Sequence, residues 1–178
     1  MNRSFAISVV LMASLLSACE KAETIVPPPL ELTSDAVDHF CGMNVLEHAG
    51  PKGQVLLKNG GKPVWFSSSR DAVAFTRLPE EPKDIAAIYV SDMSHATSWQ
   101  APGSQNWVEA DRAFFVVGSK VHGGMGAPET VPFSVRADAE EFAKKNGGRV
   151  SILGEIKDQD VLGTSTSAPA SSEIESNG

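Results

Sequence analysis

The sequence predicts an α+β fold made of two homologous ββαβ-type units that pack together. The first observation is an internal repeat, in which the pattern Phe-Ser-x-x-x-Asp-Ala-x-x-Phe occurs at residues 66–75 and again, 67 positions later, at 133–142. The second is that an extended Val-x-Phe segment leads into each copy and an apolar segment follows it. Neither unit is long enough to bury a large core alone, so we expect the two to pack against each other.

The first unit is expected at residues 35–95. Its predicted elements are extended segments at 42–47, 54–58 and 64–66, a helix that follows Ser67, and a strand at 85–90. The sequence Ala-Gly-Pro-Lys-Gly between the first two segments is typical of a turn. Ser67 is of a residue type that often caps helix N-termini. Ala72, Phe75 and Leu78 then form an apolar stripe at helical spacing.

The second unit is expected at residues 96–162 and repeats this order. Its predicted elements are a strand at 113–117, an extended segment at 131–133, a helix that follows Ser134, and a strand at 150–156. Ala139, Phe142 and Ala143 form the apolar stripe of the helix. The helix is predicted to end at 144–148, where two lysines and an asparagine are followed by two glycines.

The start of the chain carries an export signal. Arg3 precedes an apolar run at residues 5–16 that is too short to span a bilayer comfortably, so residues 1–18 are predicted to be a signal peptide. The small residues before Cys19 look like a bacterial lipobox, which predicts cleavage there and lipid on the cysteine sulfur. A plain secretory signal with a chance cysteine is the alternative.

The segments that flank the folded region are poor in apolar residues. Residues 19–34 include three consecutive prolines and several charges, so we expect a lipidated N-terminus followed by a semi-rigid tether. Residues 163–178 consist largely of Ser, Thr, Ala and acidic residues, and we expect a disordered tail there.

The charge of the chain excludes one class of partner. The formal net charge is −7, and the sequence contains no basic patch, so we expect no binding to nucleic acid. The sequence also contains no phosphate-binding loop, no paired-carboxylate signature and no nucleotide fingerprint.

The candidate chemistry centres on Cys41. The chain has 2 cysteines, and if Cys19 carries lipid, Cys41 is left as an unpaired thiol in an oxidising compartment. Together with Met43 it forms a thiolate and thioether pair, which suits Cu(I). Two ordinary readings remain open: both side chains pack well in a core, and an unlipidated Cys19 could form a disulfide with Cys41.

A third sulfur donor is predicted in the second unit. Met125 stands between glycines, where it has few neighbours to pack against, although methionine can also serve as adaptable filler. Cys41, Met43 and Met125 would form a neutral Cu(I) site, and the supply of cysteines excludes a zinc site with two or four thiolates. His39 and His122 flank these residues, and each is a fourth ligand, a supporting donor or a solvent-facing side chain.

Two other functions compete with copper binding. A thiol-dependent enzyme, with a fold like that of organomercurial lyase, would use Cys41 as a nucleophile, but nothing in the sequence identifies His39 or His48 as its base. A structural envelope lipoprotein would need Cys41 only for stability.

Met93 and His95 form another Met/His pair, in a loop after the strand predicted at 85–90.

Several short motifs occur together between the signal peptide and about residue 156. They are the lipobox Cys19, Cys41-Gly42-Met43, Tyr89-Val90-x-Asp92-Met93, Trp107-x-x-Ala110 before Phe115-Val116-Val117-Gly118, Met125-Gly126 and Asn146-Gly147-Gly148. As a set they resemble the NosL family, copper-binding lipoproteins accessory to nitrous oxide reductase. Some members carry a second cysteine three residues before the Cys-Gly-Met motif, where this chain has Asp38.

The resemblance implies a Cu(I) metallochaperone without turnover. It implies a protein of the cell envelope, anchored by lipid on Cys19, with its domain in the periplasm of a denitrifying bacterium and the choice of inner or outer membrane left open. Such a chaperone would deliver copper to an ABC-type assembly complex and to nitrous oxide reductase. The metal ligands of the family carry over to Cys41, Met43 and Met125.

Overall fold

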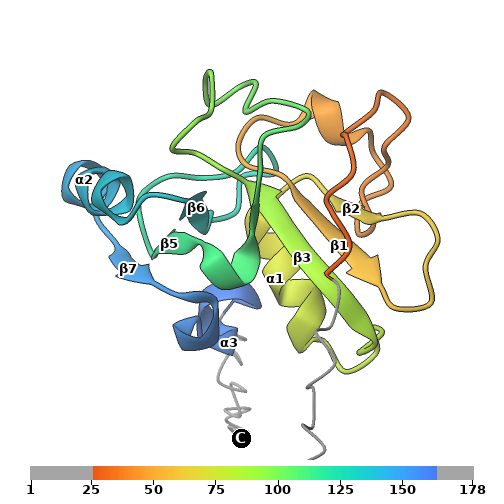
Figure 1. Cartoon of the computed structure of the whole chain (residues 1–178). Helices are drawn as coiled ribbons and strands as arrows, with labels where there is room; N and C mark the ends of the chain where they lie inside the picture. Colours follow the sequence, from red (N-terminus) through yellow and green to blue (C-terminus); the bar gives the residue numbers. More distant parts are fainter. Residues whose placement is uncertain (1–25, 164–178) are drawn as a thin grey trace, which may run out of the picture.

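The computed structural model describes residues 26–163. The predicted signal peptide, Cys19 and nearly all of the predicted tail lie outside the described residues. Within them, two antiparallel sheets lie side by side, and the helices pack against the sheets (Figure 1).

The first sheet contains four strands in the order β2-β1-β3-β4. These are β1 (Gly53–Leu57), β2 (Val64–Phe66), β3 (Ile85–Ser91) and β4 (Trp107–Glu109). Helix α1 (Ser69–Arg77) connects β2 to β3. The strand β4 belongs by position to the range that we assigned to the second unit, but it pairs with β3 of the first sheet.

The second sheet contains three strands in the order β6-β5-β7. These are β5 (Phe114–Val117), β6 (Val131–Phe133) and β7 (Arg149–Ser151), and helix α2 (Arg136–Asn146) connects β6 to β7. Both units thus run strand, strand, helix, strand, and in both the first strand lies between the other two. The predicted α+β fold of two ββαβ-type units is confirmed.

Two predicted strands were wrong in part. The segment at 42–47 is not extended throughout, because a 3-10 turn η1 (Val45–Glu47) forms where the Asn44 side chain accepts a hydrogen bond from the backbone N–H of Leu46. The strand predicted at 150–156 ends at Ser151 and is followed by η3 (Leu153–Glu155), where Glu155 accepts from the N–H of Ile152. In both places a side chain nearby in the sequence accepts a hydrogen bond from a backbone N–H group, in place of a carbonyl of a neighbouring strand.

Both predicted helix caps were also wrong. Ser68, one residue after Ser67, caps α1 by accepting from the N–H of Asp71. Helix α2 begins after Val135 with no side-chain cap. The N–H groups of Ser67 and Ser134 donate instead to aspartates from distant loops. The predicted C-terminal end of α2 is confirmed, because Gly147 has a φ of +76°.

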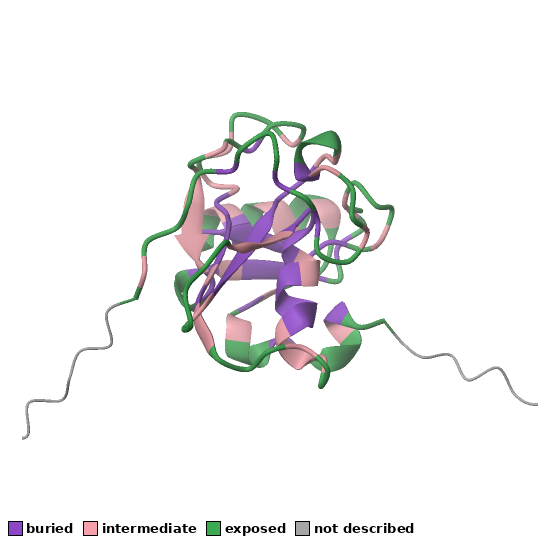
Figure 2. Ribbon diagram, turned by 90° about the vertical axis from the view of Figure 1, so that its right-hand side faces the viewer, coloured by how far each residue is buried: buried purple, intermediate pink, exposed green. Residues whose placement is uncertain are grey.

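The largest apolar cluster joins the two units. It contains Val73 of α1, Val90 of β3, Phe115 and Val117 of β5, and Val161 of α3 (Asp158–Val161). Figure 2 shows the buried residues gathered in the strands and in a central helix, with exposed residues on the loops around them. This shared core confirms that the units pack together, because it takes residues from elements of both units.

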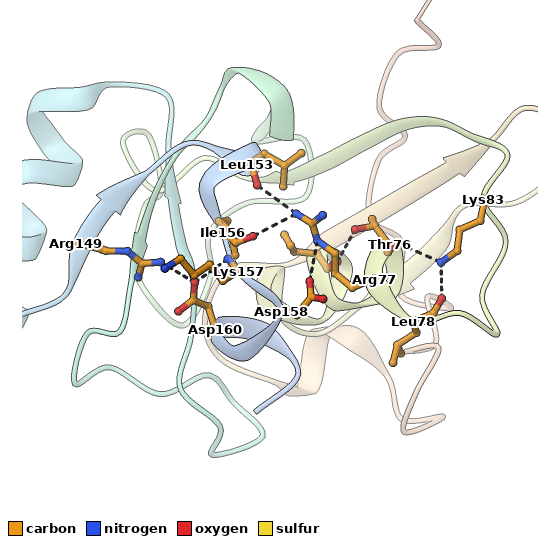
Figure 3. A network of polar contacts seen from close by, with 11 residues as sticks. Thr76, Arg77, Leu78, Lys83, Arg149, Leu153, Ile156, Lys157, Asp158 and Asp160 are labelled. Carbon is orange, nitrogen blue, oxygen red and sulfur yellow. Dashed lines mark hydrogen bonds and ion pairs between the residues drawn. The ribbon is translucent and has the colours of Figure 1, made fainter. Parts of the chain in front are cut away.

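Polar contacts reinforce the same junction at the C-terminal end of α1. The Arg77 guanidinium donates to the carbonyl oxygens of Leu153 and Ile156, each at 3.4 Å, and pairs with Asp158 (Figure 3). Backbone carbonyls away from regular secondary structure need hydrogen-bond donors, and the Arg77 guanidinium supplies one to these two carbonyls. Arg77 thereby connects α1 to the last described segment of the chain.

The segment expected to be a tether is docked where the structure describes it. The hydroxyl of Tyr89 donates to the carbonyl of Pro27, and Gln54 exchanges two hydrogen bonds with the backbone of Leu30. Leu32 is buried beside Val45. Residues 27–32 are therefore part of the folded domain. Over the described range, no helix is long and apolar enough to cross a membrane.

Candidate metal site

The loop that carries Cys41 is organised by a buried carboxylate. Oδ1 of Asp38 accepts hydrogen bonds from the N–H groups of Phe40 and Cys41, each at 2.9 Å, and Oδ2 accepts from the N–H of Ser67 at 2.6 Å. Burial alone would raise the pKa of Asp38, but the hydrogen bonds from Cys41 and Ser67 lower it below its ordinary value. Asp38 thus fixes the Cys41 loop to the start of the α1 segment.

The sulfur atoms of this loop are accessible. Cys41 is a free thiol of intermediate burial, and Met43 is 42% exposed. Gly42 between them has a φ of +71°, which a residue with a side chain rarely adopts. Burial raises the pKa of the Cys41 thiol, and the charge of Asp38 raises it further. The thiol therefore carries its proton at neutral pH until a metal displaces it.

The loop that carries Met125 rests on the first unit. The N–H of Gly124 donates to the carbonyl of Ala49 at 3.0 Å. The approach is so close that a Cβ atom at Gly124 would lie 2.8 Å from both the nitrogen of Ala49 and Cβ of His48. Met125 itself is 46% exposed. The prediction that this methionine is not a core residue is in line with its exposure.

Both loops are anchored at the same end of α1. Asp38, before Cys41, accepts from the N–H of Ser67, and Glu129, after Met125, accepts from the N–H of Arg70. The tertiary structure therefore brings to one helix end two segments that are more than 80 residues apart in the sequence.

The two candidate histidines differ in what they contact. Nε2 of His39 pairs with Glu81 at 2.8 Å, and its ring packs edge-on against Phe66 and Phe75. His122 is exposed, and its Nδ1 contacts the carbonyl of Lys120 at 3.0 Å, which leaves Nε2 available. Both imidazoles are exposed, and each has one ring nitrogen with no hydrogen bond among the described residues, so both remain candidate ligands.

The donor set limits what kind of metal this part of the chain can hold. Between residues 26 and 163, no three His, Cys, Asp or Glu side chains form a group that could bind a metal ion. Methionine sulfur, which the predicted site includes, favours a soft cation such as Cu(I).

The loop at residues 92–95 binds the second unit as the Cys41 loop binds the first, an equivalence that our sequence reasoning missed. Asp92 accepts from the N–H of Ser134 at 2.9 Å, as Asp38 does from Ser67, and the N–H of Met93 donates to Pro132, as that of His39 does to Trp65. By this register, His95 occupies the position of Cys41.

The sequence contains the aspartates of both loops, but their spacing differs from the period of the repeat. Ser67 and Ser134 are 67 positions apart, as are Trp65 and Pro132, whereas Asp38 and Asp92 are only 54 apart. A search at the period of the repeat therefore does not find the second aspartate.

Comparisons with known proteins agree on one family. A family model described as NosL matches residues 29–161. The chain is 48% identical to the copper-binding lipoprotein NosL of Achromobacter cycloclastes, over 86% of this chain and 80% of the relative. It is 34% identical to the copper-binding lipoprotein NosL of Stutzerimonas stutzeri, over 86% of this chain and 79% of the relative.

A solved structure has the same fold. The crystal structure of the copper chaperone NosL from Shewanella denitrificans superposes with a TM-score of 0.68 at 37% sequence identity, and the match covers 74% of this chain and 98% of that one.

Proposed function

The chain belongs to the NosL family, and from this premise we propose that it is a lipid-anchored Cu(I) chaperone and not an enzyme. In this proposal Cys41, Met43 and Met125 bind the ion, and His122 or His39 is the candidate for a fourth ligand. The relatives are named as copper-binding lipoproteins, and the related crystal structure is named as that of a copper chaperone.

The observation that carries the proposal is the pair of exposed sulfur-bearing loops at one end of α1. Cu(I) binds well to two to four soft donors, and one thiolate with two thioethers balances its single positive charge. Met43 and Met125 are neutral, so they contribute ligands without a proton to lose. Only Cys41 releases a proton when the ion binds.

The exposure of the thioethers suits a cargo that has to leave again. A partner's sulfur or imidazole can approach the ion as Met43 or Met125 dissociates, because neither side chain is enclosed by the fold. In the segment that carries Met43, Val37, Phe40 and Leu46 are also exposed, which gives this segment an apolar surface. We propose that the recipients are an ABC-type assembly complex and, through it, nitrous oxide reductase.

The location follows from the same premise. Lipid on Cys19 would anchor the chain in the cell envelope, and the domain would face the periplasm. Copper in the Cu(I) state is the expected cargo because the proposed ligands are soft sulfur donors.

The structure gives little support to a thiol enzyme. A catalytic thiol needs a depressed pKa or an adjacent base. Here burial and Asp38 raise the pKa of Cys41, and the neighbouring His39 is paired with Glu81. We therefore do not favour the organomercurial-lyase-like alternative.

A competition titration tests the proposal. In competition with a chromogenic Cu(I) chelator, the Cys41→Ala variant should no longer bind Cu(I) tightly. Its circular dichroism and thermal unfolding should stay close to those of the original chain. His95→Ala is the matched control and should bind as the original chain does. Unchanged binding in the Cys41 variant would refute the proposal, and X-ray absorption of the loaded protein would count the sulfur and nitrogen neighbours.

A further inference from the structure

Glu129 is a buried carboxylate with a dense set of donors. It is 2% exposed, and its Oε1 accepts from the N–H of Arg70 at 2.9 Å and from that of Thr130 at 3.0 Å. The hydroxyls of Ser68 and Ser69 donate to the same oxygen at 3.0 and 3.1 Å. A single side chain of the second unit thus accepts from three consecutive residues at the start of α1 in the first unit.

This carboxylate has no counterpart in the other half of the repeat. At the spacing of 67 that relates the two units, the residue equivalent to Glu129 is Lys62, which is exposed. The contact is therefore not a requirement of the ββαβ fold itself, because helix α2 of the second unit begins without an equivalent carboxylate.

Glu129 also closes the loop that carries Met125. Its N–H donates to the carbonyl of Val121 at 3.1 Å, so residues 121–129 form a loop joined at its base. A Cβ atom at Gly123 would lie 2.6 Å from Oε2 of Glu129, which shows that the carboxylate packs directly against the inner side of this loop.

The cost of burying this charge indicates that it has a specific use. Burial raises the pKa of Glu129 to about 7, although the Arg70 N–H, the Ser68 hydroxyl and the Thr130 N–H all favour the charged form. Its Oε2 has no hydrogen-bond partner in the described structure. An apolar residue of similar size often stabilises such a position better, and buried polar groups are commonly kept where they select one geometry.

We propose that Glu129 is a positioning residue for the metal site, which holds the Met125 loop on the N-terminal end of α1 so that the thioether can meet the ion bound by Cys41. The proposal rests on the proposed function, because it assigns a ligand role to Met125. Glu129 touches no metal in it and acts only through the loop.

A double-mutant cycle tests this role. Glu129→Ala should weaken Cu(I) binding in the chelator competition by about 10- to 100-fold, the range typical of residues that orient a ligand. It should also remove one sulfur neighbour from the X-ray absorption spectrum. If Glu129 acts through Met125, then adding Glu129→Ala to Met125→Ala should cause no further loss.

Two other variants guard against a folding defect. Glu129→Gln keeps the Oε1 acceptor and should restore both the affinity and the sulfur count. Gly123→Ala places a methyl group against Oε2 and should reproduce the loss of one sulfur while the first unit stays intact.

Copper-free measurements separate the two proposals. Amide hydrogen exchange at Gly124 and Thr130 should accelerate in Glu129→Ala and not in Glu129→Gln. If Cys41→Ala abolishes binding while Glu129→Ala leaves affinity and sulfur count unchanged, the positioning role is refuted and the chaperone proposal stands. If the loop loosens as expected but binding does not depend on Cys41, the chaperone proposal fails instead. The positioning role is also refuted if Glu129→Ala lowers Cu(I) affinity by the same factor in the Met125→Ala variant as in the original chain.

Discussion

The Cys41 loop and the His95 loop are built on the same backbone frame but present different chemistry. In each, a buried aspartate, Asp38 or Asp92, accepts the N–H of the serine that follows the second strand of its unit. Three residues after the aspartate comes Cys41 in one loop and His95 in the other. The duplication thus copied the anchor and the turn, and the functional difference lies in a few side chains.

The surroundings of the two loops differ as much as their side chains. His95 is 67% exposed, and its Nδ1 pairs with Asp92 at 2.7 Å, a hydrogen bond that raises the pKa of the imidazole. Met93 packs in the cluster of Val131 and Phe133. The second loop therefore has one imidazole nitrogen engaged and a partly buried methionine packed against the core of the second unit, whereas the first carries a free thiol and the exposed Met43.

Exchanging the distinguishing residue should produce the largest effect. Cys41→His places the residue of the second loop into the first and removes the anionic donor. Since orienting residues alone account for about 10- to 100-fold, we expect a loss of Cu(I) affinity greater than about 100-fold in chelator competition. The reverse change, His95→Cys, should create no tight site, because no methionine sulfur is exposed beside it; a second bound ion there would contradict this account.

Removing each anchor should separate stability from binding. Asp38→Ala and Asp92→Ala each leave backbone N–H groups without their charged acceptor, and we expect each to lower the free energy of unfolding by about 4 kcal/mol in urea titrations. Only Asp38→Ala should also weaken Cu(I) binding. Equal losses of affinity in both variants would mean that the two loops do not differ in function.

The buried carboxylate of the second unit should make the stability of the protein depend on pH. The pKa of Glu129 is raised from 4.5 to about 7 on folding, so the folded state binds the proton more tightly than the unfolded state. Stability should therefore fall as pH rises from about 4.5 to about 7, by about 3 kcal/mol in total. Glu129→Gln should lack this contribution, and parallel slopes for the two proteins in urea unfolding across this range would contradict the prediction.

The smallest expected effect concerns the two helix starts. Ser68 caps α1, whereas Val135 at the same place before α2 makes no side-chain cap and is exposed. Val135→Ser should raise the free energy of unfolding by about 1 kcal/mol, because it supplies a missing acceptor without removing a core contact. Thermal unfolding would measure the gain, and a decrease in stability would show that Val135 has a packing role.

Local patterns accounted for most of the fold. The two helices were predicted from apolar stripes of side chains three and four residues apart, because such side chains share a helix face. The stripes are Ala72, Phe75 and Leu78 in the first unit and Ala139, Phe142 and Ala143 in the second. The errors concern element ends, where side chains bind backbone N–H groups. Ser68 and not Ser67 caps α1, and the N–H of Ser67 donates to Asp38, a contact that sequence spacing does not show.

The sequence by itself determined the class of fold, the duplication and the sulfur-bearing residues Cys41, Met43 and Met125, because these depend on residue type and short spacing. The tertiary structure alone decided that the loops of Cys41 and Met125 are both anchored near the start of α1. It joined Asp38 to Ser67 just before the helix and Glu129 to Arg70 in its first turn, and it matched His95 to Cys41. Those relations depend on contacts between residues far apart in the chain. The free energy of packing determines which residues make these contacts, and their order in the sequence does not.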